Sequence, residues 1–175
     1  MLKLNLARIR GAREQFERVY EASECAPDGD TYRVLAPVSL QFDIFKDQNR
    51  FRLAGSVKTT LELECSRCVE PFEWPVDAAF DLQYRPRPEG TEGHRREREV
   101  GPEEFSDAFY DDETIDLGQL MTEQFYLSIP MKPLCQDACR GLCPQCGINL
   151  NRGQCACEPV WVDPRLAALE ALKRQ

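Results

Sequence analysis

Cysteine is the residue type that most constrains how this chain can fold. Nine cysteines stand in 175 residues, and eight of them form pairs with one to three residues between the partners. An odd number of cysteines argues against a disulfide framework, and close pairing in a reducing compartment is typical of thiolates that hold a metal ion. The pairs are Cys65 with Cys68, Cys135 with Cys139, Cys143 with Cys146, and Cys155 with Cys157. Cys25 stands apart, and we expect an ordinary buried or free thiol there.

The motif Cys-Pro-Gln-Cys-Gly at residues 143–147 has the pattern of a zinc knuckle. Two intervening residues allow both sulfurs to reach one ion from a tight turn. Pro144 restricts φ in that turn, and Gly147 can adopt the left-handed conformation needed at its exit. A further pair, Cys155 and Cys157, follows after a loop-forming stretch. Four thiolates around Zn²⁺ form a closed tetrahedral site, so the motif predicts structural rather than catalytic zinc.

A second four-cysteine site is expected from the remaining pairs. The motif Cys-Ser-Arg-Cys at residues 65–68 lies between two expected strands, which argues against a thioredoxin-like redox motif. The preferred grouping is therefore two zinc sites, Cys65, Cys68, Cys135 and Cys139 in one, and Cys143, Cys146, Cys155 and Cys157 in the other. An alternative grouping joins Cys135, Cys139, Cys143 and Cys146 and leaves the other four as a second or partial site. Iron is a competing occupant, although the knuckle and the Cys-Ala-Cys pair favour zinc.

The metal is also expected to stabilise the cysteine-rich segment. Residues 135–157 contain few large aliphatic side chains, so burial alone would not hold them together. Structural zinc contributes about 10–16 kcal/mol of coupled binding and folding in small zinc fingers. Each centre of four thiolates and one Zn²⁺ carries net negative charge. Four basic residues are positioned either to offset that charge or to contact phosphate: Arg67, Lys132, Arg140 and Arg152.

Apolar residues alternate with polar ones through three segments of the N-terminal half, residues 34–44, 51–63 and 72–84. A period of two over three segments with short connections predicts an antiparallel meander. In such a meander one face of the sheet is buried and the other faces water.

Helices are expected on either side of this meander. The pattern predicts one over residues 11–22, one from the capping residue Asp116 to Pro130, and one that begins at Asp163. The predicted fold is therefore of the α+β class, an antiparallel β meander with flanking helices and a C-terminal Cys-rich zinc-binding module.

Composition divides the chain into three parts. Residues 1–84 are expected to form the N-terminal strand, helix and antiparallel sheet, residues 85–113 a charged, acidic mobile linker, and residues 114–175 a helix, the zinc-knuckle module and the C-terminal helix. The formal net charge is −8, and every charged side chain from Glu99 to Glu123 is acidic. A broad basic surface for nucleic acid is therefore missing from most of the chain. We hypothesise that the acidic segment, residues 99–123, instead docks a basic ribosomal protein.

Catalysis has little support in this sequence. The single histidine, His94, lies in a charged loop, so the usual histidine-dependent mechanisms lack their base. We therefore expect no enzyme and no small-molecule substrate. No segment approaches the ~20 apolar residues of a membrane span, and the start of the chain lacks the apolar core of a signal peptide. These features predict a cytoplasmic protein without a membrane partner.

Five segments, taken together, are specific to one protein family: LECSRCVEPF (63–72), IDLGQL (115–120), EQFYLSIPM (123–131), CRGLCPQCGINLN (139–151) and DPRLAAL (163–169). With them the chain resembles the YceD family of bacterial and plastid proteins, described as large ribosomal RNA subunit accumulation proteins. The resemblance runs from about Val57 to the C-terminus. It implies a role in the accumulation of 23S-type ribosomal RNA, and hence in large-subunit biogenesis, without an established enzyme activity.

Two functions from different classes follow. The leading interpretation is a non-enzymatic, zinc-stabilised accessory factor that binds large-subunit rRNA or a basic ribosomal or assembly protein. The paired cysteines also resemble the zinc centre of a redox-regulated holdase, in which oxidation expels the metal and unfolds a segment. The alternative is therefore a redox-sensitive zinc switch or a holdase-type protein.

Overall fold

The computed structural model describes residues 2–25, 31–87 and 107–157, and the chain divides into two compact units. The first unit comprises Met1–Leu63 and Phe72–Pro133. The second comprises Glu64–Pro71 and Leu134–Gln175. The turn at residues 64–71 therefore belongs to the same unit as the cysteine-rich segment, although residues 72–133, which lie between them in the sequence, belong to the first unit.

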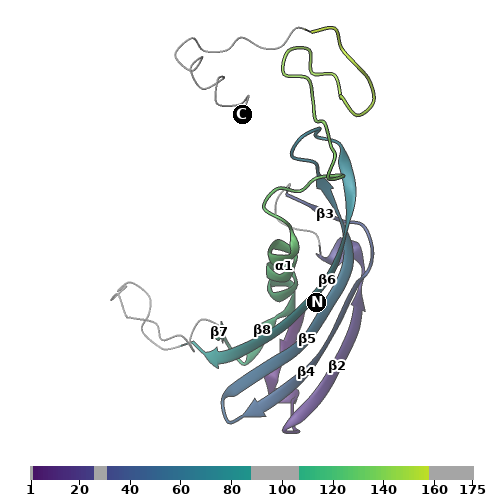
Figure 1. The fold of residues 1–175 in the computed structure, drawn as a ribbon. Helices are drawn as coiled ribbons and strands as arrows, with labels where there is room; N and C mark the ends of the chain where they lie inside the picture. Colours follow the sequence, from purple (N-terminus) through teal and green to yellow (C-terminus); the bar gives the residue numbers. More distant parts are fainter. Residues whose placement is uncertain (1, 26–30, 88–106, 158–175) are drawn as a thin grey trace, which may run out of the picture. The chain divides into compact units, whose positions relative to one another are not determined.

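Six strands of the first unit form one sheet: β2 (Arg13–Tyr20), β3 (Arg33–Val34), β4 (Val38–Asp47), β5 (Arg50–Glu64), β6 (Pro71–Pro86) and β7 (Asp107–Tyr110). The strand order is β2-β4-β5-β6-β7, and β3 pairs with β5 (Figure 1). Strand β4 is antiparallel to both β2 and β5, whereas β7 is parallel to β6. The consecutive strands β4, β5 and β6 are neighbours, which confirms the predicted meander.

The remaining elements of the first unit are short. Strand β1 (Lys3–Asn5) pairs antiparallel with β8 (Thr114–Asp116) in a separate two-stranded sheet. The helix α1 (Leu117–Ser128) follows β8 directly, and the 3-10 helices η1 (Leu6–Arg8) and η2 (Ala22–Cys25) flank β2. None of the helices in the described ranges is both long and apolar enough to cross a membrane.

The alternation of apolar residues buries one face of the sheet, as the sequence predicts. In β4 the alternate apolar positions are at most 3% exposed: Val38, Leu40, Phe42 and Ile44. The antiparallel register sets Ile44 opposite Leu53 and Phe42 opposite Gly55. A Cβ atom on Gly55 would overlap the carbonyl oxygen of Gln41 and the Cα of Phe42, so the close approach of β4 and β5 requires glycine here.

The helix α1 begins at the predicted cap. The carboxylate of Asp116 accepts hydrogen bonds from the backbone N–H groups of Gly118 and Gln119, at 2.9 and 3.1 Å. The side chain of Gln119 donates to Glu123 instead of completing a capping box. The predicted inner face of the helix is buried and joins the core of the sheet: Leu117, Leu120, Met121, Gln124 and Phe125.

The helix predicted over residues 11–22 is wrong, because Arg13–Tyr20 form strand β2. All eight residues of this strand pair with β4, from Arg13 opposite Phe45 to Tyr20 opposite Val38. Without β2, that edge of β4 would leave its backbone N–H and C=O groups unpaired. The side chains of this segment are compatible with either a helix or a strand. Pairing with β4 therefore decides the conformation and overrides the local helix propensity.

The fold is consequently richer in β structure than the predicted α+β arrangement with flanking helices. Among the described residues α1 is the one α-helix. Strand β7 lies within residues 85–113, which the sequence assigned to a linker, and its parallel pairing with β6 gave no local signal. The helix predicted from Asp163 lies outside the described residues.

Candidate metal centre

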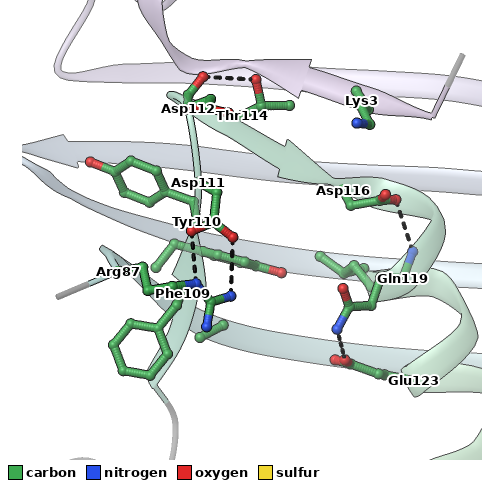
Figure 2. A pocket seen from close by; sticks show the side chains of 13 residues that line it. Lys3, Arg87, Phe109, Tyr110, Asp111, Asp112, Thr114, Asp116, Gln119 and Glu123 are labelled. Carbon is green, nitrogen blue, oxygen red and sulfur yellow. Dashed lines mark hydrogen bonds and ion pairs between the residues drawn. The ribbon is translucent and has the colours of Figure 1, made fainter. Parts of the chain in front are cut away.

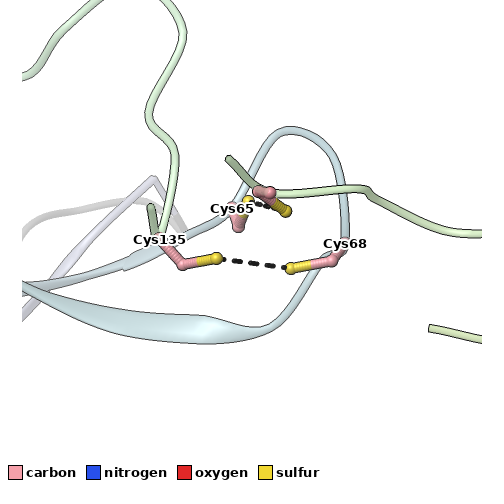
Figure 3. A group of neighbouring side chains, drawn as sticks. Cys65, Cys68 and Cys135 are labelled. Carbon is pink, nitrogen blue, oxygen red and sulfur yellow. Dashed lines mark hydrogen bonds between the residues drawn. The ribbon is translucent and has the colours of Figure 1, made fainter. Parts of the chain in front are cut away.

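The first cysteine cluster is built on the turn between β5 and β6. The N–H of Cys65 donates to the carbonyl of Glu70 at 3.0 Å, and the N–H of Val69 donates to the carbonyl of Cys65 at 2.9 Å. Val69 has a φ of 60°, a left-handed conformation that is rare for a β-branched residue. This tight turn directs the side chains of Cys65 and Cys68 toward one point (Figure 3).

Two cysteines from the C-terminal segment complete this cluster. The Sγ atoms of Cys65 and Cys139 are 3.7 Å apart. Those of Cys68 and Cys135 are also 3.7 Å apart (Figure 3). All four sulfurs lie within 4.8 Å of one another. Four ligands at about 2.3 Å from a tetrahedral ion would have sulfur–sulfur separations of about 3.8 Å, whereas a disulfide needs about 2.0 Å. The spacing therefore suits one shared ion and not disulfides.

The second cluster contains Cys143, Cys146, Cys155 and Cys157, whose sulfurs also lie within 4.8 Å of one another. The predicted knuckle is present around its first pair. The N–H of Gly147 donates to the carbonyl of Cys143 at 2.9 Å, and Gly147 has a φ of 71°. Glycine adopts this left-handed conformation without steric cost. The two clusters have the membership of the preferred grouping, and not of the alternative that joins residues 135–146.

Backbone and amide groups hold the first cluster in place. The guanidinium of Arg67 donates to the carbonyl of Cys139 at 2.7 Å, and the carbonyl of Arg67 accepts from the N–H of Leu142 at 3.1 Å. Asn151 donates from Nδ2 to the Sγ of Cys139 at 3.3 Å, and its Oδ1 accepts from the N–H of Arg140 at 2.8 Å. Asn151 therefore connects the backbone next to the cluster with one of its sulfurs.

A second set of contacts joins the turn to the loop between the last two cysteine pairs. Glu70 forms an ion pair of 2.6 Å with Arg152 and accepts from Asn149 at 3.3 Å. Sequence reasoning missed Glu70, Asn149 and Asn151 as supporting residues. The asparagines were visible only as loop-forming residues, and nothing local in the sequence connects Glu70 to a loop about 80 positions later.

The pKa values of the thiols differ widely within each cluster. Burial opposes ionisation of Cys65, but backbone N–H groups, among them that of Cys135, donate to its sulfur and lower its pKa to about 6. Burial, together with the neighbouring cysteines, raises the pKa of Cys135 to about 12. In the second cluster, backbone N–H groups of Cys146 and Gln145 lower the pKa of Cys143 to about 6.

The same cluster raises the pKa of its last thiol. Hydrogen bonding with Cys146, then burial and the remaining thiols, raise the pKa of Cys157 to about 12. Each cluster thus ionises one thiol readily and resists ionisation of another. A divalent ion would remove this conflict, because its charge would stabilise all four thiolates together. The donor set, the spacing and the charges all fit a metal ion.

The two clusters differ in how far solvent reaches them. Three thiols of the first cluster are buried, with Cys65, Cys68 and Cys139 at 2, 4 and 3% exposure. In the second cluster only Cys143 is buried. Cys25 joins neither cluster among the described residues; it lies in the core of the first unit, where burial raises its pKa to about 11.

Replacing Asn151 with alanine tests the support of the first cluster. The variant loses the donor to Cys139, and groups that hold metal ligands typically account for about 10- to 100-fold in affinity. We expect Asn151→Ala to weaken the binding of one of two metal ions by about tenfold in a competition titration with a chelator. Gln154→Ala, an exposed loop change, is the control. Equal affinities for both variants would exclude this role.

The comparisons with known proteins cover the part of the chain that contains both cysteine clusters. The family model for "Large ribosomal RNA subunit accumulation protein YceD" matches residues 53–173. A chloroplastic protein of Arabidopsis thaliana, named large ribosomal RNA subunit accumulation protein YCED homolog 1, is 27% identical over 168 residues, which cover 85% of this chain and 50% of that protein. No solved structure matches the chain significantly.

Bacterial relatives are similar to this chain as well. An uncharacterised protein of Mycobacterium tuberculosis is 35% identical over 121 residues, 67% of this chain and 53% of its own length. The uncharacterised protein YlbN of Bacillus subtilis is 27% identical over 168 residues, 92% of this chain and 88% of its own length. The chain spans about half the length of the plant and mycobacterial relatives. Because the family model covers well over half of the chain, the protein belongs to the YceD family.

Proposed function

We propose that this protein is a non-enzymatic, zinc-stabilised cytoplasmic factor in the accumulation of large-subunit ribosomal RNA and in large-subunit biogenesis. The observation that carries the proposal is the pair of closed four-thiol clusters in a chain of the YceD family. The names of the plant relatives supply the process, accumulation of the large ribosomal RNA subunit.

Zinc is the ion that suits both clusters best. Four sulfur donors at tetrahedral separations are typical of structural Zn²⁺, and four protein ligands leave no open position for water or substrate. This closed arrangement supports a structural rather than a catalytic role. Iron in a rubredoxin-type centre uses the same donors and is the competing occupant.

Charge favours a basic protein over ribosomal RNA as the direct partner. The chain carries a formal net charge of −8, while affinity for RNA comes largely from neutralised phosphates. Two of the arginines considered for phosphate contact are engaged within the second unit. Arg67 donates to the carbonyl of Cys139, and Arg152 pairs with Glu70. Their contacts support the charge-offsetting role, and we propose a basic ribosomal or assembly protein as the partner.

Elemental analysis of freshly purified, reduced protein tests the zinc proposal. We expect about two zinc ions per chain, and about one after Cys65→Ser, because that variant removes a ligand from one closed site. Cys25→Ser, which changes a core thiol outside both clusters, is the control and keeps both ions. Chelator treatment should increase hydrogen exchange in residues 134–157 more than in the sheet. Bound iron, or unchanged exchange after metal removal, would contradict the proposal.

Crosslinking in cells tests the partner. Mass spectrometry of proteins crosslinked to the tagged chain should recover basic large-subunit or assembly proteins. Sequencing of co-purified RNA should recover large-subunit precursors that are lost when those proteins are removed by protease. An untagged strain is the control. Direct RNA crosslinks that survive the protease step would make rRNA the partner instead, and random messenger fragments with unrelated proteins would refute a ribosomal role.

A redox switch is the second candidate, and the solvent exposure of the second cluster favours it. Three of its four thiols are not buried, so peroxide can reach them more readily than the first cluster. We expect mild peroxide to release about one zinc ion per chain and to oxidise Cys146, Cys155 and Cys157 first, as read by mass spectrometry. A switch also requires that aggregation of an unfolded client decreases after release. Zinc release without a decrease in client aggregation would contradict the switch and support a purely structural role for the metal.

A further inference from the structure

A cavity of about 740 Å³ lies in the first unit among β7, β8 and the start of α1 (Figure 2). Its volume is within the range of pockets that bind ligands. Acidic side chains outnumber basic ones in its lining. The acidic side chains are Asp111, Asp112, Asp116 and Glu123, and the basic ones are Lys3 and Arg87.

One of the two basic groups is already engaged. Arg87 forms a two-point contact with Asp111, with Nε–Oδ1 at 2.7 Å and Nη2–Oδ2 at 3.0 Å (Figure 2). Its guanidinium also lies 6.0 Å from the ring centre of Phe109. This pair is neutral overall, so three carboxylates remain in the cavity against the ammonium of Lys3.

The remaining carboxylates have neutral partners or none. Asp116 accepts from backbone N–H groups at the start of α1, and Glu123 accepts from the side-chain amide of Gln119 at 2.9 Å (Figure 2). The carboxylate of Asp112 forms no hydrogen bond or ion pair with the residues that the structure describes. The cavity therefore keeps negative charge that the protein itself does not neutralise.

A buried phenol opens into the same cavity. Tyr84 lines it and is only 6% exposed, yet its hydroxyl has no hydrogen-bond partner within residues 2–25, 31–87 and 107–157. Burial raises the pKa of Tyr84 to about 12, and the charges of Glu123 and Asp116 add to that effect. The hydroxyl thus stays neutral and can accept a hydrogen bond from an incoming donor.

A bare divalent cation does not fit these features. Within the described residues, groups of three or more closely spaced ligand atoms occur only at the two cysteine clusters, so the carboxylates of the cavity are too dispersed to coordinate one ion. An extended cation with several donors suits dispersed acceptors better. A guanidinium has five N–H donors and also packs on aromatic rings such as Phe109, which is 48% exposed.

We infer that this cavity receives an arginine side chain of a basic partner protein, with Asp112 and Glu123 as acceptors and the hydroxyl of Tyr84 as a third. The inference rests on the proposed function for its choice of partner, a ribosomal or assembly protein. By this inference the first unit binds the partner protein, and the cysteine clusters of the second unit have a structural role.

Fluorescence anisotropy with a labelled Gly-Arg-Gly-Arg-Gly peptide tests the site, and the same peptide with citrulline in place of arginine tests the need for charge. We expect the paired change Asp112→Asn and Glu123→Gln to weaken binding about tenfold, because it removes two acceptors of charged hydrogen bonds. Tyr84→Phe should weaken it severalfold. The charge-matched control, Glu17→Gln with Glu73→Gln, changes exposed strand residues outside the cavity and should bind like the unaltered chain.

The outcomes separate the site from the general function. Equal loss in the cavity variant and the control would mean diffuse attraction and overturn the inference, as would binding of the citrulline peptide with the same affinity. Thermal unfolding of each variant checks that the fold persists, and Tyr84→Phe, which retains the ring, provides the test if the paired change unfolds the chain.

Recovery of ribosomal proteins by the unaltered chain and the cavity variant alike would refute this site while leaving the proposed function intact. No recovery by the unaltered chain would refute the proposed function itself.

Discussion

The second unit depends on sulfur atoms brought together from distant parts of the chain. Cys65 and Cys139 are separated by 74 positions, and Cys68 and Cys135 by 67, yet both sulfur pairs are 3.7 Å apart. Closing loops of that length costs conformational entropy, and crowding four ionisable thiols adds electrostatic repulsion. A bound divalent ion would offset both, because it would attract every thiolate and connect the two segments. Other contacts of this unit, such as Arg67 with Cys139, depend on that connection.

The two clusters have different environments within one unit. The first is largely buried, and its sulfur at Cys139 is supported by Asn151. The second is largely exposed and closes a knuckle within the C-terminal segment. Loss of the first ion would separate the turn at residues 64–71 from the C-terminal segment. Loss of the second would release only a local loop. Oxidation of the exposed cluster could therefore occur while the buried cluster still connects the turn to the C-terminal segment.

Features with a local physical cause could be predicted from the sequence. The alternation in β4, the cap at Asp116 and the knuckle glycine Gly147 each follow from side chains near one another in the chain. Features that depend on distant partners could not. The strand β2 forms because β4 offers it an edge, and β7 adds parallel to β6 without any local pattern of its own. Cysteine spacing alone also left two groupings open, because the tertiary structure, and not the local sequence, brings residues 65–68 close to Cys135 and Cys139.

Charge would act differently at the proposed metal sites and at the proposed binding cavity. Each centre of four thiolates and Zn²⁺ would add negative charge to a chain whose formal net charge is already −8, so bound zinc would increase the overall attraction to a basic partner. That attraction accelerates encounter but does not select a residue, since exposed charges act over long distances and are screened by salt. Selection requires acceptors at fixed positions, such as the buried side chain of Tyr84 that lines the proposed cavity. The proposed ions and the proposed cavity therefore differ in what they require: the ions need only hold the segments of the second unit together, whereas the cavity needs its acceptors at fixed positions.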